Sequence, residues 1–547
     1  MRSRLRPSVI LTAIAFSVSI CHSYAQNASK PPTTSAEVFR VAGTVVSKLD
    51  GHPLANARVA LASTKARQQA ESVTTSEDGK FEFTGVPAGK YSLSGAKRGY
   101  IPAGYDQHDQ YSTAIVTGAG LDTENLVLKL DPNSVIAGRV LDEAGEPVRD
   151  AGITLYRDNH VEGVHQIQTF GGSQTNDLGE FEIPNLVPGT YFMSASGQPW
   201  YAVHPPSDTR LAGDFDHSLD VAYPLTYYGD ATEPDSATPI TVHGGEHLQT
   251  EIHLSPVPSL HITVHVTKSG DNQYPFPQFE QPAFDGSVPL RRYENRMSEP
   301  GTWEIIGLPA GKYDVRLTGQ NGGAQMSGVE LDSTTQQLDT TTAESTCSLK
   351  VSVSFEGPHP TAQHFIVLRG KSARISQGRQ LDSKGEAEFQ NLAPGRYEVA
   401  LFGEGTQIAV GRMVTDGAAA SGHAVTLAPG SSVSLSITAL RGTAEVQGVV
   451  QRSGKPFAGA MVVLVPRDPA NNRDLFRRDQ SDLDGTFALH DVIPGTYTAV
   501  AIENGWDLDW SQPELIAGYA KNGIPVQVSN KPAQNLNLSS PVELQQK

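Results

Sequence analysis

The residues whose types and spacing could support catalysis lie in the segment HGGEH, residues 243–247. The segment matches the H-x-x-E-H spacing with which one class of peptidase binds zinc. Zinc needs such ligands on one rigid helical face or strand end, whereas Gly244 and Gly245 disfavour a helix. The segment also aligns with the turn TGAGLD of an earlier repeat. We therefore interpret it as a polar turn, expect no metal and no cofactor, and keep a zinc-dependent hydrolase as the least favoured alternative.

Aromatic residues in loops suggest a second chemistry, the binding of sugars. Aromatic faces stack on the apolar faces of sugars while neighbouring carboxylates bind hydroxyl groups. Aromatic residues stand nine positions after a repeated tyrosine at Tyr100, Trp200 and Trp506. Each ring could instead close the open end of its own domain.

Two long insertions, residues 201–237 and 270–300, add to the candidates, since loops of this length in compact domains are usually functional or disordered. A role in packing domains together is an alternative for them. The candidate binding residues are Tyr100, Trp200, Tyr201, Tyr223, Tyr227, Tyr228, Trp506 and Trp510, with Asp214, Asp216 and His217 beside them.

Two further groups have ordinary structural explanations. Asp482 and Asp484 in SDLDG resemble calcium ligands, but the loop lacks the other oxygen ligands and the distal Glu of an EF-hand. Aspartate also forms turns, which explains both residues. Cys347 is the one cysteine left after removal of an export signal, and we expect it to be buried as an apolar residue.

A fivefold repeat must position these residues. DGKFEFTGVPAGKY (78–91) recurs in NDLGEFEIPNLVPGTY (176–191), SEPGTWEIIGLPAGKY (298–313), DSKGEAEFQNLAPGRY (382–397) and DLDGTFALHDVIPGTY (482–497). In every copy two glycines are ten apart and a tyrosine stands two after the second. The first glycine suits the positive φ of a hairpin turn, and residues two and four beyond it share one strand face. The tyrosine ring is expected to be buried, with its hydroxyl bonded to backbone.

Alternating strands flank the repeat. Upstream of copies one, two and five a second hairpin-like unit recurs, as in VAGTVVSKLDGHPLANARVAL. Copies three and four keep the alternation and lose the turn. Downstream, GLDTENLVLKLDP and GEHLQTEIHLSP have the pattern of closing strands. About seven short strands per unit predict an all-β protein, a tandem array of about five immunoglobulin-like or transthyretin-like β-sandwich domains.

These residues resemble the carboxypeptidase regulatory-like domain, a transthyretin-like sandwich that is also similar to B-type repeats of collagen adhesins. The resemblance implies a carbohydrate-binding-like scaffold rather than a particular ligand. The predicted organisation is a signal peptide (1–25), a flexible segment (26–37) and five sandwiches. The sandwiches are placed at 38–131, 132–257 with the insertion 201–237, 258–345, 346–440 and 441–547, of which the third and fourth are divergent.

The composition and the N-terminal segment limit the functions that this protein can have. Arginines followed by the apolar run VILTAIAFSVSIC and the sequence SYA predict an export signal, and hence a secreted or periplasmic protein without later membrane insertion. The formal net charge of −17 makes nucleic acid and anionic membranes unsuitable partners. The sequence thus predicts a non-catalytic, multi-domain protein that binds a glycan or cell-envelope polymer through loop aromatics. A structural spacer or protein-interaction module is the alternative.

Overall fold

The computed structural model describes residues 37–65, 70–118, 120–205, 215–268, 273–290, 292–319, 322–355, 363–370, 376–403, 406–421, 423–440, 442, 444–529 and 534–547. The predicted signal peptide, the segment 26–36 and the candidate Asp214 lie outside the described residues.

The first module, β1 to β8, is a sandwich of two small sheets. One layer has the order β4-β1-β8 and is formed by β1 (Val38–Ser47), β4 (Lys80–Pro87) and β8 (Leu126–Leu130). The facing layer contains β2 (Arg58–Ser63), β3 (Glu71–Thr74), β5 (Gly89–Ala96), β6 (Ala103–Gly104) and β7 (Ile115–Thr117). Along β8 buried and exposed residues alternate, because successive side chains of a strand point to opposite faces.

The second and third modules repeat this plan with longer strands. Module 2 has the sheet β12-β9-β17, made of β9 (Ser134–Leu141), β12 (Glu180–Leu186) and β17 (His247–His253). Its other sheet contains β10 (Gly152–Val161), β11 (Val164–Gln174), β13 (Gly189–Ser196), β15 (Thr226–Tyr227) and β16 (Ile240–Val242). A short pair, β14 (Val221–Ala222) with β18 (Val257–Pro258), leads into module 3.

Module 3 has the sheet β22-β23-β19-β26, formed by β19 (Leu260–His265), β22 (Glu294–Glu299), β23 (Thr302–Leu308) and β26 (Gln337–Leu338). Its facing sheet contains β20 (Phe276–Ala283), β21 (Gly286–Pro289), β24 (Gly311–Gly319), β25 (Gly322–Leu331) and β27 (Glu344–Ser345).

In modules 4 and 5 one strand joins the two layers. Module 4 consists of β28 (Cys347–Phe355), β29 (His364–Gly370), β30 (Ser376–Gln380), β31 (Glu386–Leu392), β32 (Gly395–Gly403), β33 (Thr406–Asp416), β34 (Ala419–Ser421), β35 (Ala424–Leu427) and β36 (Ser432–Leu440). Its strand β33 pairs with both β32 and β36.

Module 5 consists of β37 (Ala444–Arg452), β38 (Lys455–Pro456), β39 (Met461–Pro466), β40 (Arg477–Gln480), β41 (Thr486–Val492), β42 (Gly495–Ile502), α1 (Pro513–Ala520), β43 (Ile524–Val528), β44 (Asn535–Asn537) and β45 (Val542–Gln545). Here β45 pairs with both β37 and β42.

All five modules share one topological rule. The first strand pairs antiparallel with the strand after the first repeat glycine and parallel with a strand near the end of the module. The antiparallel pairs are β1–β4, β9–β12, β19–β23, β28–β31 and β37–β41. The parallel pairs are β1–β8, β9–β17, β19–β26, β28–β36 and β37–β44. The tandem all-β array predicted from the repeat is therefore confirmed, and the divergent modules 3 and 4 follow the same rule.

The repeat positions that were expected to form cores do so. Phe81, Phe83, Phe181, Ile183, Ile305, Phe389, Phe487 and Leu489 are all buried. Trp303 and Ala387 are partly buried and pack against their cores. The five largest clusters of buried apolar residues follow one another along the chain, one for each module. The module boundaries drawn from the sequence stay a prediction.

The repeat tyrosines form the backbone contact expected of them in every copy. Each hydroxyl donates to the carbonyl four residues earlier. The pairs are Tyr91–Pro87 (3.0 Å), Tyr191–Val187 (2.8 Å), Tyr313–Pro309 (2.6 Å), Tyr397–Ala393 (2.8 Å) and Tyr497–Ile493 (2.8 Å). Four of the side chains are buried and Tyr91 is half-buried. The bond closes the Pro-Gly turn and satisfies a carbonyl that the turn removes from the sheet ladder.

The predicted hairpins around the first repeat glycine are wrong in most copies. Among the described strands, β22 and β23 pair across Gly301, but β3 does not pair with β4, nor β11 with β12. The glycine instead lies where the chain joins the first strand of its module. In module 1 the carbonyl of Gly79 accepts from the Val45 amide of β1 at 2.8 Å. A Cβ at Gly79 would lie 2.8 Å from the Val45 carbonyl oxygen, and its φ is +74°. Close approach and positive φ both require glycine here.

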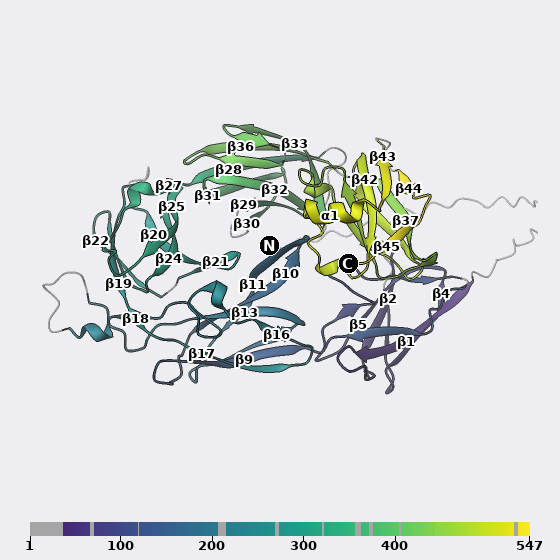
Figure 1. Ribbon diagram of the computed structural model, residues 1–547, viewed down its shortest axis with the longest axis horizontal. Coiled ribbons are helices and arrows are strands. Elements are labelled where there is room, and N and C mark those ends of the chain that lie inside the picture. Colours follow the sequence, from purple (N-terminus) through teal and green to yellow (C-terminus); the bar gives the residue numbers. More distant parts are fainter. Residues whose placement is uncertain are drawn as a thin grey trace, which may run out of the picture.

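The five modules follow one another around a closed loop, in which module 5 lies against module 1 (Figure 1). The β10–β11 hairpin of module 2 extends across the middle of this loop towards α1 (Figure 1). Hydrogen bonds between residues more than 300 positions apart establish both contacts. Two junctions therefore set the arrangement of the molecule.

Candidate functional site

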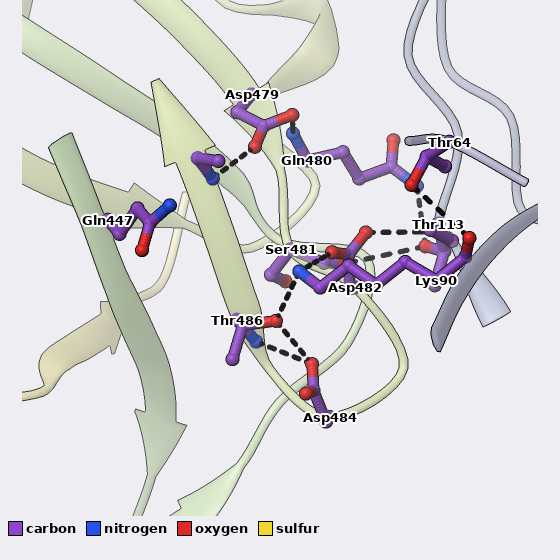
Figure 2. A network of polar contacts seen from close by, with 12 residues as sticks. Thr64, Lys90, Thr113, Gln447, Asp479, Gln480, Ser481, Asp482, Asp484 and Thr486 are labelled. Carbon is purple, nitrogen blue, oxygen red and sulfur yellow. Dashed lines mark hydrogen bonds and ion pairs between the residues drawn. The ribbon is translucent and has the colours of Figure 1, made fainter. Parts of the chain in front are cut away.

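The first junction joins module 1 to the repeat turn of module 5. The Lys90 ammonium donates to the Asp482 carboxylate and to the Thr486 hydroxyl, the latter at 2.8 Å (Figure 2). Asp482 also accepts the backbone N–H of Ala114 at 3.1 Å. Lys90 occupies the outward-facing position between the second repeat glycine and Tyr91, so its side chain is directed away from its own core and towards module 5.

Backbone and amide groups extend this junction. The Leu483 amide donates to the Ala114 carbonyl at 3.0 Å, and the Leu483 side chain packs against the core of module 1. Gln480 donates to the Thr113 hydroxyl at 2.7 Å (Figure 2). It also donates to the Asp106 carbonyl at 2.6 Å. The junction thus combines a satisfied polar network with apolar contact.

Burial sets the electrostatics of this junction. Removal from water raises the pKa of the Asp482 carboxyl, and the Lys90 ammonium opposes that shift. Burial also raises the pKa of Asp479 to about 6, although the amides of Ala488 and Gln480 bond to its carboxylate. A buried carboxylate is costly unless it is paired, so the contact depends on Lys90.

The second junction is formed by the tip of the β10–β11 hairpin. Glu162 and Gly163 both have positive φ, +51° and +71°, as a two-residue type I′ turn requires. The Gly163 carbonyl accepts from the Ser511 hydroxyl at 2.8 Å, and the glycine lies against the Trp510 ring. A Cβ at Gly163 would lie 2.5 Å from Trp510 Cε2, so the tip fits module 5 only with glycine.

The same tip also contacts module 4. The Glu162 carboxylate pairs with the Arg369 guanidinium on β29. The Glu162 carbonyl accepts from Arg473 of module 5 at 3.1 Å. On the hairpin stem, the His165 amide donates to Asp509 at 2.6 Å, and the Ile167 amide donates to Asp285 of module 3 at 2.8 Å. One hairpin therefore connects modules 3, 4 and 5.

The predicted binding aromatics of module 5 belong to these junctions. The Trp506 ring stacks on His108 of module 1, with ring centroids 5.1 Å apart and planes 4° apart. Trp510 is buried beneath the hairpin tip and beside Phe476, with Arg478 over its ring. The expectation that Trp510 offers a face to a ligand is therefore wrong, because module 2 and its own module cover it.

The tyrosines of the 201–237 insertion are covered as well. Tyr223 is buried in the core of module 2, and its hydroxyl donates to Glu143 at 3.0 Å. Burial raises the pKa of Tyr223. Tyr227 is buried in a cluster with Tyr156 and Ala283 of module 3, and half-buried Tyr228 packs against the module 2 core. Tyr223 and Tyr227 thus serve packing, and the expectation that they stack on a ligand is wrong.

The remaining candidates lie nearer the surface. Trp200 is 80% exposed, and the Tyr201 ring stands at 89° to it with centroids 5.8 Å apart. Half-buried Tyr201 donates its hydroxyl to Glu143. The half-buried Tyr100 has its hydroxyl 3.4 Å from His52 Nε2.

Two further insertion candidates have local roles. Asp216 accepts the Ser218 amide at 3.0 Å and so caps a short 3₁₀ helix that begins at His217.

Residues 243–246 form a turn between β16 and β17, as the sequence indicates, and His247 is the first residue of β17. Glu246 accepts the His243 amide at 2.7 Å, and the two side chains lie 3.1 Å apart. The described part of the chain contains no group of three or more His, Cys, Asp or Glu side chains that could hold a metal ion. Cys347 is buried, as expected, and its thiol contacts the Ala428 carbonyl.

The family model of the carboxypeptidase regulatory-like domain matches residues 40–123, the span that contains Lys90, Thr113 and Ala114. Module 1 is therefore similar to the carboxypeptidase regulatory-like domain. The match supports the resemblance that the repeat indicates for this module. No curated protein matches the chain.

Several solved structures are similar to parts of the chain. The minor pilin GBS52 of Streptococcus agalactiae is 15% identical over 40% of this chain and 96% of its own, with a TM-score of 0.20. The TIE protein of Bacillus anthracis is 12% identical over 75% of this chain and 76% of its own, with a TM-score of 0.17. BcpA, the major pilin subunit of Bacillus cereus, is 10% identical over 74% of this chain and 99% of its own, with a TM-score of 0.15.

Module 1 thus contributes Lys90 and Thr113 to the first junction, and no sequence pattern distinguishes either residue. Lys90 is a variable position of the repeat, occupied by Thr, Lys, Arg and Thr in the other copies. Asp482 forms the turn that the sequence indicates, but its second role depends on contacts with module 1. Within the described residues, no helix is long and apolar enough to cross a membrane.

Proposed function

We propose that this protein is an exported, non-catalytic scaffold whose five sandwiches close into a ring. The observation that carries the proposal is the junction of module 1 with module 5, where Lys90, Asp482 and Leu483 make ionic, backbone and apolar contacts. A flexible string of independent modules does not need such contacts. Closure gives the protein one rigid shape, with the β10–β11 hairpin across its centre. Such a shape suits a spacer or assembly module that binds other proteins.

Closure also explains why the loop aromatics are largely covered. Trp506 and Trp510 stabilise the two junctions, and each ring removes apolar surface from water. The closed arrangement of the five modules is thus stabilised by these loop tryptophans, which would be exposed in an open string of modules.

Chemical crosslinking tests the proposal. Carbodiimide joins an amine to a carboxylate in contact, so it should link Lys90 to Asp482 within one molecule. Lys547 and Asp507, 2.5 Å apart within module 5, are the positive control. A Lys90–Asp482 peptide from the monomer supports closure. Recovery of the control peptide alone, or a Lys90–Asp482 link that forms between isotopically distinct molecules, contradicts it.

Glycan binding stays a second candidate at one position. Trp200 presents most of its ring to solvent beside Tyr201, an arrangement that suits stacking on a sugar. A glycan or envelope polymer would then bind at the edge of module 2. Loss of glycan-array binding in Trp200→Ala, with unchanged binding in Tyr100→Ala as a matched loop variant, supports this function. A wild-type protein that binds no glycan contradicts it.

A further inference from the structure

A cavity of about 680 Å³ lies beside the tip of the β10–β11 hairpin. It is walled by module 4, by residues 469–471, 473 and 511–513 of module 5, and by Val164 of the hairpin. The volume is within the range of pockets that hold small organic ligands, about 300–1,000 Å³. The walls come from modules 2, 4 and 5, so the cavity requires the hairpin to be docked as it is in the closed ring, and the inference rests on the proposed function.

Positive charge dominates the lining. Arg369, Arg396 and Arg473 contribute guanidinium groups, and Glu398 is the one carboxylate among the described residues that line the cavity. His423, also in the lining, contacts Asp474, which raises the pKa of the imidazole. This concentration of cations is unusual in a chain with a formal net charge of −17.

The arginines are incompletely compensated. Arg369 pairs with Glu162, yet its Nη1 atom is buried without a hydrogen-bond partner. Arg473 bonds to the Glu162 carbonyl, a neutral acceptor. Among the described residues, neither Arg473 nor Arg396 lies within 4.0 Å of a carboxylate. Burial and the neighbouring Arg369 lower the pKa of Arg473. Arg369 and Arg473 are partly buried, Arg396 is exposed, and the Glu162 carboxylate pairs with Arg369 alone, so the net positive charge of the lining favours the entry of an anion.

We propose that this cavity binds an oxyanion group, a carboxylate or sulfate, between Arg369, Arg396 and Arg473. The planar fork of a guanidinium bonds such groups bidentately. Asn471 and Gln512, which also line the cavity, supply neutral donors for the remaining oxygens or for sugar hydroxyls. The oxyanion can arrive as a free inorganic ion or as the acidic group of a saccharide, and both present the same chemistry to the arginines.

Calorimetric titration of the full mature chain tests the proposal, with sulfate, trigalacturonate and neutral maltotriose as probes. Saturable binding of sulfate or trigalacturonate, but not of maltotriose, supports the site. Trigalacturonate that binds at least tenfold more tightly than sulfate identifies an acidic saccharide, and equal affinities identify the free ion. The absence of saturable binding by either anion overturns the site.

Three variants locate the binding. Arg396→Gln and Arg473→Gln should each weaken anion binding by about tenfold or more. Arg467→Gln removes an equal charge from an exposed position of module 5 outside the cavity lining and should change affinity less than twofold. Arg396 is exposed and has no role in either junction, so its variant remains informative if Arg473→Gln disturbs the fold. Equal losses in all three variants overturn the site.

The Lys90–Asp482 crosslink on the same samples separates the two proposals. A crosslinked protein that binds neither anion overturns the cavity site and leaves closure intact. A protein that lacks the crosslink but binds an anion overturns closure between modules 1 and 5 and leaves the cavity site, which module 1 does not line, intact. A protein that shows neither overturns both.

Discussion

The ammonium group of Lys90 donates to the carboxylate of Asp482, a residue 392 positions further along the chain. The side chains are 30% and 14% exposed, so the pair is largely removed from water. In such pairs the loss of one partner costs more than the intact pair contributes, because the remaining charge is left desolvated. This relationship makes the junction between modules 1 and 5 sensitive to single substitutions.

Lys90→Met should open the junction. It leaves Asp482 desolvated and should cost about 3 kcal/mol locally. Hydrogen exchange at the Ala114 and Leu483 amides, which bond across the junction, should then accelerate by roughly a hundredfold. Lys312→Met removes the exposed lysine at the equivalent position of module 3 and is the matched control.

Asp482→Asn in the Lys90→Met background should restore part of the protection, because a neutral amide costs less to bury than an unpaired carboxylate. Unchanged exchange in Lys90→Met would show that the ion pair does not hold the junction.

The repeat tyrosines should differ in their contribution to stability according to burial. Tyr313→Ala removes a fully buried ring and should lower the free energy of unfolding by about 3 to 5 kcal/mol. Tyr313→Phe, which deletes only the bond to the Pro309 carbonyl, should cost about 1 kcal/mol. Tyr91→Ala should cost less than Tyr313→Ala because the Tyr91 ring is half-buried. Urea unfolding measures all three, and equal costs for the two alanine variants would contradict this account.

Gly163→Ala should displace the hairpin tip from module 5. The added Cβ would meet the Trp510 ring at 2.5 Å in addition to the strain of a positive φ. Gly145, also in module 2, has φ +79° and nothing within 4 Å of an added Cβ, so Gly145→Ala reports the strain alone, about 1 kcal/mol. Acrylamide quenching of tryptophan fluorescence should increase in Gly163→Ala and stay at the wild-type value in Gly145→Ala. Equal quenching in the two variants would exclude a docked tip.

The contact between modules 4 and 5 should weaken at alkaline pH. The hydrogen bond to Asp474 raises the pKa of His423 above its usual 6.5. A histidine whose pKa is higher in the folded than in the unfolded state stabilises the fold when it is protonated. This stabilisation is complete below about pH 6.5, the unfolded-state pKa, and is lost as the pH rises through the folded-state pKa. Glu398 and Arg473 are charged groups that line the same cavity as His423. Both are unchanged in a His423→Gln variant, so a comparison with wild type isolates the effect of His423.

Thermal unfolding of wild type and His423→Gln between pH 5.5 and 8.5 checks this dependence. The difference between their midpoints should be largest at the low end of this range, pH 5.5 to 6, and should shrink as the pH rises. A difference that is constant or grows with pH would contradict the assignment.

The interior of each module could be predicted from the sequence, and the contacts between modules could not. Phe487 and Tyr497 stand in a spacing that occurs five times, and each module builds its core at these positions. The contacts between modules each occur once in the molecule. The residues that make them therefore have no repeated sequence pattern that would predict their role, as is the case for Lys90, Trp506 and Trp510. Asp482 is fully explained by the turn that it forms, so the sequence gives no reason to predict its second role as the partner of Lys90. The predicted hairpins failed because local glycine and strand patterns do not show to which sheet a strand is added.

Small-angle X-ray scattering from the monomeric mature protein tests the closed arrangement most directly. Closure predicts a scattering profile that matches the one calculated from the structure, and a radius of gyration that increases in Lys90→Met but not in Lys312→Met. A wild-type profile typical of an elongated, flexible string of five modules, unchanged by Lys90→Met, would contradict it.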